Sequence, residues 1–309
     1  MELIRGLYNW RPEHRGTVLT IGGFDGVHLG HQALLATLKR KAGEMRLPAT
    51  VMSFEPNPRE YLLGQKAPAR LQSFREKCMA LAECGVDRFL CLRFDHRLSG
   101  LTSDEFCHQI LGEAIGVRWL IVGHDFKFGR GREGGLESLK ERGRRWGFGV
   151  DEFSAYLVGT ERVSSTLIRD ALATGDLPRA QTMLGRPYAI SGRVVHGEKL
   201  GRTLGFPTAN MRLRRRVIPL HGIFAVRVSG GGLQSAPAVA SLGTRPVVNG
   251  AEPLLEVHVF DYDGDLYGEH LQVEFVERLR DERWFPSLDD LVTQMQQDAL
   301  QAREILRTN

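Results

Sequence analysis

The chain has 309 residues with 42% hydrophobic and 25% charged side chains, a formal net charge of +4 and a pI near 9.0. This composition excludes a disordered or collagen-like chain, and the length is sufficient for two hydrophobic cores. A mildly basic chain is compatible with nucleic acid and equally with small anions. No long lysine or arginine tract favours nucleic acid, so we expect small-molecule partners. The oligomeric state stays open.

The cysteines and the N-terminus indicate the compartment. The cysteines are Cys78, Cys84, Cys91 and Cys107, and they form no Cys-x-x-Cys pair. We therefore interpret them as reduced structural thiols. The N-terminus lacks a charged-then-apolar leader, and no apolar run approaches the length of a membrane span. These features predict a cytoplasmic protein without a membrane partner.

The first predicted strand, residues 18–21, leads into a loop rich in glycine and histidine at residues 22–31. Leucines at helical spacing follow, so the loop joins a strand to a helix. Unpaired N–H groups and the positive end of the helix dipole make such a junction an anion site, and its glycines let a phosphate approach the backbone. His28 and His31, three residues apart, are expected on one side of the first helical turn.

Other interpretations of this loop remain open. Its glycine spacing is neither the dinucleotide fingerprint nor a Walker loop. A histidine pair on one helix face is also compatible with zinc, with Asp25 as a third ligand, or with two ordinary surface histidines. The run His28-Leu29-Gly30-His31 resembles the H-x-G-H signature of nucleotidyltransferases, whose imidazoles meet the phosphates of a nucleoside triphosphate.

The first half of the chain continues as alternating strands and helices. Strands are predicted at residues 49–54, 89–94 and 119–122, with helices between them, and an extended loop is predicted at residues 54–58 around two prolines. Repeated βα units predict a mostly parallel, doubly wound sheet. Ligands bind such sheets at the carboxyl ends of the strands, where the loop at residues 22–31 lies.

Two further loops carry residues suited to a nucleotide. Residues 123–134 mix aromatic, cationic and glycine residues that suit a planar ring and a phosphate, although an exposed flexible loop is the alternative. At residues 163–169 a helix is predicted to begin beside Ser164, Ser165 and Thr166, with Arg169 one turn further. Capping needs one hydroxyl, and three together with an arginine favour a phosphate site.

The periodicity changes beyond Arg186. Short β-rich runs at residues 188–195, 222–228, 236–242, 254–260 and 271–275 are separated by glycine turns and predict a small antiparallel barrel. We place the domain boundary between residues 1–186 and 187–309. The C-terminal helix, capped at Ser287, has an apolar stripe that favours packing on its own barrel over binding a partner.

The chemical stretch of the second half is Gly201 to Asn210. Thr208 and Asn210 alternate to one side of an extended segment and offer two neutral oxygens to a hard cation such as Mg²⁺, whereas a simple Asx turn is the alternative. Glu256 interrupts an apolar run in which burial of a carboxylate is costly without a task. The alternative is that Glu256 and His258 share the solvated face of a strand.

Four motifs of the first half together resemble the FMN adenylyltransferase half of bacterial bifunctional FAD synthetases. They are the loop at residues 22–31, the run at residues 54–58, Asp125-Phe126-Lys127-Phe128-Gly129, and the serines and threonine before Arg169. The resemblance implies a Rossmann-like nucleotidyltransferase domain. It implies ATP and phosphate binding by Gly22, Gly23, Phe24, Asp25, His28, His31, Ser164, Ser165, Thr166 and Arg169, and flavin binding by Asn57, Pro58, Asp125, Phe126 and Phe128.

The second half resembles the riboflavin kinase module. The shared motifs are Pro207-Thr208-Ala209-Asn210, residues 222–224 and 242–246, and Glu256-x-His258-x-Phe260-Asp261. In that family the threonine and asparagine hold magnesium and the glutamate is the catalytic base. The resemblance adds ATP binding by Gly201, Arg202, Gly205, Phe206, Pro207 and Thr208. Ser241 and Val247 depart from the family pattern at positions that concern flavin binding.

The resemblance therefore implies an enzyme that phosphorylates riboflavin to FMN and adenylylates FMN to FAD, with ATP as co-substrate and Mg²⁺ as metal. His28, His31 and Glu256 are the candidate catalytic residues. Two rival hypotheses are an adenylyltransferase with an inert barrel and a flavin- or RNA-binding regulatory protein. The second needs aromatic platforms along a basic groove, whereas the aromatic residues here cluster beside glycine-rich loops.

Overall fold

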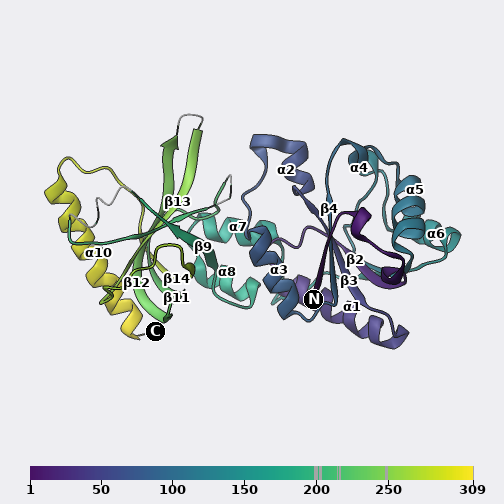
Figure 1. Cartoon of the computed structure of the whole chain (residues 1–309), viewed down its shortest axis with the longest axis horizontal. Helices are drawn as coiled ribbons and strands as arrows, with labels where there is room; N and C mark the ends of the chain where they lie inside the picture. The colour runs from purple at the N-terminus through teal and green to yellow at the C-terminus, as the bar shows by residue number, and fades with distance from the viewer. Residues whose placement is uncertain (198–200, 202–203, 214, 216, 248–249, 309) are drawn as a thin grey trace. The chain divides into compact units, whose positions relative to one another are not determined.

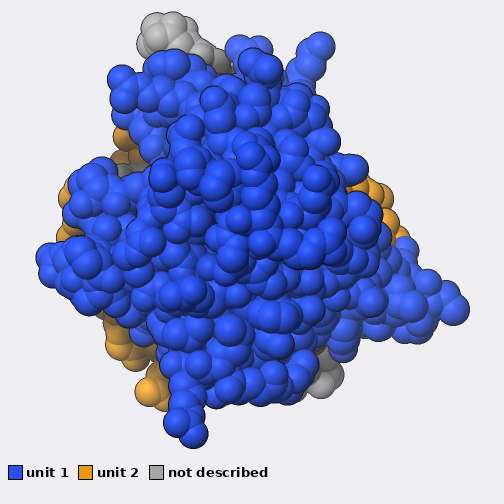
Figure 2. Space-filling model, turned by 90° about the vertical axis from the view of Figure 1, so that its right-hand side faces the viewer, with its two compact units in different colours: residues 1–68, 74–164 blue, residues 69–73, 165–309 orange. Residues whose placement is uncertain are grey.

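A computed structural model describes residues 1–197, 201, 204–213, 215, 217–247 and 250–308. The chain divides into two compact units, coloured in Figure 2. Unit 1 contains residues 1–68 and 74–164, and unit 2 contains residues 69–73 and 165–309. Each unit is described by itself. Among the described residues, no helix combines the length and the hydropathy needed to cross a membrane.

Unit 1 is built on a parallel sheet with the strand order β1-β4-β3-β2-β5-β6. Figure 1 labels its strands β2, β3 and β4. Its strands are β1 (Glu2–Arg5), β2 (Thr17–Ile21), β3 (Ala49–Glu55), β4 (Arg88–Arg93), β5 (Val117–Gly123) and β6 (Gly149–Phe153). The doubly wound parallel sheet predicted from the alternating pattern is thus confirmed. A small hairpin of β7 (Leu157–Val158) and β8 (Glu161–Arg162) follows the sheet.

Helices cover both faces of this sheet. They are α1 (Leu29–Met45), α2 (Pro58–Leu63), α3 (Phe74–Glu83), α4 (His96–Gly100), α5 (Ser103–Glu105), the π-helical segment η4 (Phe106–Ile115) and α6 (Leu136–Trp146), with short 3-10 turns at residues 7–9, 12–14, 64–66 and 130–132. One core packs apolar residues of α1 and α3 on the sheet, and a second core packs those of η4 and α6. The central strands β2 and β3 are buried along most of their length, as expected for a sheet covered on both faces, whereas the edge strands β1 and β6 are more exposed.

The strand order places two of the predicted loops together. The chain passes from β2 to β3 in one direction along the sheet, and β5 lies on the other side of β2. Ligands bind doubly wound sheets at such a reversal, outside the carboxyl ends of the strands. The loops at residues 22–28, after β2, and at residues 124–135, after β5, both begin at this edge.

The predicted extended loop at residues 54–58 is shorter in the structure. Strand β3 continues to Glu55, and α2 begins at Pro58. Asn57 caps the helix: its Oδ1 accepts from the Arg59 N–H at 2.9 Å, and Glu60 Oε2 accepts from the Asn57 N–H at 3.2 Å. Proline is tolerated at the first helical position, so Pro58 starts a helix here.

Unit 2 contains an antiparallel barrel whose described strands close in the order β10-β13-β12-β11-β14-β9. They are β9 (Ala189–Val195), β10 (Ala209–Arg212), β11 (Gly222–Gly230), β12 (Leu233–Val247), β13 (Gly250–Val259) and β14 (His270–Arg280). The predicted barrel is confirmed, and the extended segment around Asn210 is one of its strands. Buried residues such as Val226, Leu255 and Phe275 fill the interior.

The C-terminal helix α10 (Leu288–Thr308) packs on the barrel with one half of its apolar stripe. Ala302 and Leu306 contact Ala225 and Phe260. Two nitrogens of Arg303 bond the carboxylate of Asp261 at 2.7 and 2.8 Å. The other half of the stripe, near Leu288 and Met295, lines a cavity instead. The predicted packing on the barrel therefore holds for the C-terminal half of the helix.

Elements before residue 187 complete unit 2. Helices α7 (Ser165–Ala173) and α8 (Leu177–Leu184) precede the barrel, and α8 contacts β14. The segment at residues 69–73 also belongs to unit 2. Its Leu71 is fully buried, and the Leu71 carbonyl accepts from Arg215 Nη1 at 3.1 Å. Apart from residues 69–73, unit 2 starts at Ser165. The predicted domain boundary after residue 186 stays a prediction.

This packing predicts that α7 and α8 stabilise the barrel. A fragment of residues 187–309 should fold but melt at least about 5 °C below a fragment of residues 165–309, because it exposes the apolar surface that α8 covers. Circular dichroism melts of the two fragments measure the difference. Both fragments lack residues 69–73, so the loss of that segment does not contribute to the difference in melting temperature. Equal melting temperatures would contradict the prediction.

Candidate active sites

The loop between β2 and α1 is held by buried side chains and by bonds to its carbonyl groups. Phe24 and Val27 are each 1% exposed and have positive φ angles of 45° and 39°. Such angles are strained for residues other than glycine, so the surroundings must stabilise them. Lys77 Nζ donates to the Gly23 carbonyl at 2.7 Å, and Gln32 Nε2 donates to the Val27 carbonyl at 3.0 Å.

The two histidines of this loop lie against one another. His28 caps α1, and its Nδ1 accepts the backbone N–H of His31 at 3.3 Å. The rings are stacked with centroids 3.7 Å apart. Because His28 Nδ1 is an acceptor, a neutral His28 carries its proton on Nε2. The predicted placement of both imidazoles at the helix start is thus observed, with one ring tautomer defined.

The surroundings of His31 favour its neutral form. Burial is the main cause that lowers the pKa of His31 well below 6.5, and the nearby His28 and Lys77 lower the pKa further. His31 Nδ1 is enclosed without a hydrogen-bond partner within the described structure. An imidazole with Nδ1 unprotonated keeps its proton on Nε2 and remains a hydrogen-bond donor there. Among the described residues, no group of three or more His, Cys, Asp or Glu side chains could hold a metal, so the zinc alternative gains no support.

The other residues predicted for this site lie in several places. Gly22 follows β2, and Asp25 is buried in the loop. Asp125 bonds Arg162 Nη2 at 2.9 Å in the loop after β5. The rings of Phe126 and Phe128 stack at 5.6 Å, and Phe128 belongs to the core beside Phe106. Phe128 is therefore placed for packing, and its predicted contact with flavin has no support here.

The predicted phosphate residues at the start of α7 are divided between the units. Ser164 ends unit 1, whereas Ser165, Thr166 and Arg169 belong to unit 2. A helix begins at Ser165, as predicted. Arg169 Nε donates to the Ala69 carbonyl at 2.6 Å. The joint action of these residues with the loop at residues 22–28 stays a prediction.

The barrel brings the candidate kinase residues into one row through its backbone register. Asn210 on β10 pairs with Glu256 on β13, and Glu256 pairs with Ser241 on β12. Ser241 pairs with Ile223 on β11, which pairs with Arg280 at the end of β14. Residues directly opposite in an antiparallel sheet share a face. Leu255 and Val257 are buried in the interior, so the row lies on the outer face.

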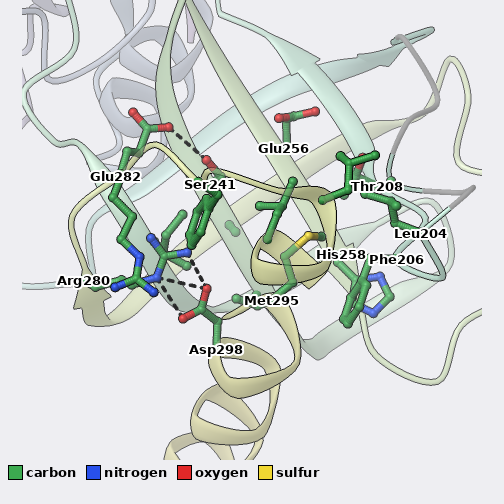
Figure 3. A pocket seen from close by; sticks show the side chains of 18 of the residues that line it. Leu204, Phe206, Thr208, Ser241, Glu256, His258, Arg280, Glu282, Met295 and Asp298 are labelled. Atoms are coloured by element: carbon green, nitrogen blue, oxygen red, sulfur yellow. Dashed lines mark hydrogen bonds and ion pairs between the residues drawn. The ribbon is translucent and has the colours of Figure 1, made fainter. Parts of the chain in front are cut away.

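This outer face is one wall of a cavity of about 670 Å³ (Figure 3). The opposite wall is the start of α10 and the segment at residues 281–287, which joins β14 to α10. Glu256 and His258 share a strand face, as the alternative interpretation held, but this face lines a cavity. Its lining includes Leu204, Phe206, Thr208, Ile223, Val239, Ser241, Glu256, His258, Arg280, Glu282, Trp284, Phe285, Leu288, Leu291, Met295 and Asp298.

A buried ion pair joins the two walls. Asp298 on α10 is 4% exposed and accepts from Arg280 Nε at 2.9 Å and from Nη2 at 2.7 Å. Gln294 Nε2 also donates to Asp298 at 2.8 Å. The sequence interpretation missed this pair. The signal was available, because Asp298 lies three residues after Met295 on the apolar side of the helix, where a carboxylate needs a partner.

Thr208 lies at the junction of two cavities. It lines the large cavity and a second one of about 280 Å³ beside Tyr262 and Asp265. Asn210 Nδ2 lies 3.4 Å from Thr208 Oγ1, and Asn210 is 7% exposed. A side chain at Gly197 would overlap the Asn210 amide, so that glycine makes room for it. Two neutral oxygen-bearing side chains are therefore in contact, and one of them, Thr208, lines both cavities.

The remaining predicted nucleotide residues precede Thr208. Gly201 accepts from the Phe206 N–H at 2.8 Å, which closes a turn that contains Gly205. A Cβ atom at Gly201 would lie 2.4 Å from the Phe206 carbonyl oxygen, so the turn requires a glycine there. The Pro207 carbonyl lies 2.9 Å from His258 Nδ1. Arg202 lies outside the described residues.

The fold and these sites define a class. A doubly wound sheet with two histidines at a strand–helix junction, followed by a barrel whose outer face carries Glu256 on a cavity wall, is the arrangement expected of a two-module phosphoryl- and nucleotidyl-transferring enzyme. Comparison with known proteins gives the family. A family model described as FAD synthetase matches residues 10–167, and one described as riboflavin kinase matches residues 184–306.

Whole-chain relatives carry both names. A bifunctional riboflavin kinase/FMN adenylyltransferase of Escherichia coli (strain K12) is 50% identical over 98% of this chain and 97% of its own length. One of Haemophilus influenzae is 46% identical over 98% of each chain. A crystal structure titled as a macrolide-efflux protein from Streptococcus pneumoniae has a TM-score of 0.82 and 31% identity, and the match covers 98% of this chain and 99% of that one. The chain belongs to the family of bifunctional riboflavin kinase/FMN adenylyltransferases.

The environment of His31 predicts a pH dependence of stability. The folded pKa lies below 6.5, so below about pH 6.5 the unfolded chain binds a proton at His31 that the folded chain does not. The free energy of unfolding should therefore decrease as pH falls, by up to about 1.4 kcal/mol per pH unit from this group. Urea unfolding at pH 7.5 and 5.5 measures it. His31→Gln should show a smaller decrease, and equal decreases would contradict the assignment.

Proposed function

We propose that the loop after β2 binds the triphosphate of ATP for transfer of AMP to FMN, and that the large cavity of the barrel unit holds riboflavin for phosphorylation by a second ATP. The family membership supports the pair of reactions. The observation that carries the first assignment is the stacked histidine pair at the α1 N-terminus. For the second it is the row of Asn210, Glu256 and Ser241 on the outer face of the barrel, where Glu256 and Ser241 line the cavity.

Adenylyl transfer needs stabilisation of charge more than it needs a base. An oxygen of the FMN phosphate attacks the α-phosphorus of ATP, and the bond to pyrophosphate breaks. The nucleophile is already an anion, so no proton has to be removed. Neutral His28, with its proton on Nε2, and neutral His31 donate to the phosphate oxygens on which charge develops, as do the N–H groups at the start of α1. Neutral donors fit the lowered pKa of His31.

Riboflavin phosphorylation needs a base as well. The 5′-hydroxyl of riboflavin attacks the γ-phosphorus of ATP and ADP leaves, while the Glu256 carboxylate takes the hydroxyl proton. Glu256 lines the cavity and lies between Ser241 and Thr208 in the view of Figure 3. The apolar and aromatic lining, which includes Trp284 and Met295, suits the flat flavin ring. The smaller cavity on the other side of Thr208 then suits the nucleotide.

The donor set at Thr208 and Asn210 fits magnesium. A hydroxyl and a side-chain amide oxygen are hard neutral ligands, and Mg²⁺ binds few protein ligands because phosphates and water complete its coordination. Bound there, magnesium would neutralise charge on the transferred phosphate. The barrel sequence thus retains every group that a kinase needs, which argues against an inert barrel. A binding protein without catalysis would not need Glu256 beside these ligands.

The first test of the proposal is His28→Ala. It should lower FMN adenylylation by about 10²–10³, the usual effect of losing one transition-state donor, while riboflavin phosphorylation continues. Chromatography of the flavins formed from riboflavin, ATP and Mg²⁺ measures both reactions in one sample. The continued formation of FMN is the control for folding. FAD formation at the normal rate would remove His28 from the proposal.

The second test is Glu256→Gln, which keeps the shape of the side chain and removes its basic carboxylate. Riboflavin phosphorylation should fall by about 10²–10⁴, and adenylylation of supplied FMN should hardly change. Thr208→Ala is the matched comparison, because its lower activity should recover partly with more magnesium, as expected for a lost metal ligand. Full kinase activity in Glu256→Gln would refute its role, and loss of both reactions would indicate misfolding.

A further inference from the structure

The cavity of unit 2 carries a second carboxylate that the transfer reaction does not use. Glu282 lies in the segment that joins β14 to α10, and its Oε1 accepts from Ser241 Oγ at 3.1 Å. A Cβ atom at Gly243 would lie 2.2 Å from Glu282 Oε1. The glycine on β12 therefore makes room for this carboxylate against the barrel. Figure 3 shows Ser241 and Glu282 joined at one side of the cavity.

Several other polar groups of the cavity already bond to one another. Arg280 and Asp298 form the two-bond ion pair described above, and His258 Nδ1 lies within hydrogen-bond distance of the Pro207 carbonyl. Ser241 uses one of the roughly four lone-pair positions of the Glu282 carboxylate. The Ser241–Glu282 pair therefore offers acceptor positions for hydroxyl donors of a bound molecule.

The position of the Ser241–Glu282 pair relative to Glu256 indicates which part of riboflavin lies beside the pair. Ser241 is the direct cross-strand neighbour of Glu256, and neighbouring strands lie about 4.8 Å apart. In riboflavin the 5′-hydroxyl ends a ribityl chain whose secondary hydroxyls lead to the ring. With the 5′-hydroxyl at Glu256 and the ring against the apolar lining near α10, the chain passes Ser241 and Glu282.

We propose that Glu282, oriented by Ser241, accepts hydrogen bonds from the secondary hydroxyls of the ribityl chain and makes the kinase specific for flavins with a polyol side chain. This inference rests on the proposed location of riboflavin. A site built to bond a hydroxyl discriminates strongly against an analogue that lacks it, because its own polar group is then left without a partner. Glu282 is a specificity residue that touches the substrate away from the reacting atoms.

The test compares two flavins in the kinase reaction of the whole chain. One is riboflavin, and the other carries a 5-hydroxypentyl chain at N10, which keeps the terminal hydroxyl and the ring but has no secondary hydroxyls. With riboflavin, Glu282→Ala should raise KM about 10- to 100-fold with little change in kcat, as expected for lost bonds to a charged acceptor that act equally before and during reaction. With the pentyl analogue, KM should change less than about threefold. Glu282→Gln keeps one acceptor oxygen, so its KM for riboflavin should lie between those of the wild type and of Glu282→Ala.

Matched variants separate the explanations. Asp281→Ala removes the adjacent carboxylate, which pairs with Arg278, and should leave the KM for both flavins near wild type. If Glu282→Ala raises KM equally for both flavins, the residue only holds the segment in place and the inference is wrong. An unchanged riboflavin KM also overturns it. Glu256→Gln should lower turnover of both flavins by about 10²–10⁴, and full activity there would instead reject the kinase site itself.

Discussion

Backbone hydrogen bonding between strands fixes where the candidate site residues lie in both units. In unit 1 the parallel strands end at one edge of the sheet, and the strand order reverses between β2 and β5, so the loops at residues 22–28 and 124–135 begin at neighbouring points. In unit 2 the barrel register brings Asn210, Glu256 and Ser241 into one row, although they are far apart in sequence. A register shift by one residue would turn the Glu256 side chain into the interior, where no phosphate or water could reach it.

The two sites handle charge in different ways. In unit 1 the helix start supplies fixed N–H donors. Burial, with smaller effects of His28 and Lys77, lowers the pKa of His31 and so favours its neutral form. Neutral imidazoles donate protons in hydrogen bonds without the cost of burying a charge. In unit 2 the proposed nucleophile is an uncharged alcohol, so the proposal gives it a carboxylate as its base. The difference follows from the state in which each nucleophile arrives.

Helix α10 both packs on the barrel and lines the large cavity. Its C-terminal half packs on the barrel through Ala302 and Leu306, and its N-terminal half leaves the barrel and forms a cavity wall. The Arg280–Asp298 pair lies where these halves meet. A buried ion pair adds little net stability, because desolvation offsets its attraction, but it defines one geometry. It therefore holds the segment with Glu282 and Trp284 at a constant distance from the barrel.

The sequence by itself determined the elements and their order. Period-two and period-3.6 patterns, glycine turns and caps depend on neighbours along the chain. They predicted the parallel sheet, the barrel, a helix start within residues 163–169, and His28 and His31 on one side of the first turn of α1. The tertiary structure decided what depends on distant pairings. It placed Phe128 in the core of unit 1, and it made the strand face that carries Glu256 one wall of a cavity. It also joined Asp298 to Arg280 and Glu282 to Ser241. Such contacts depend on the register between strands and on where α10 packs, and neither is encoded in local spacing.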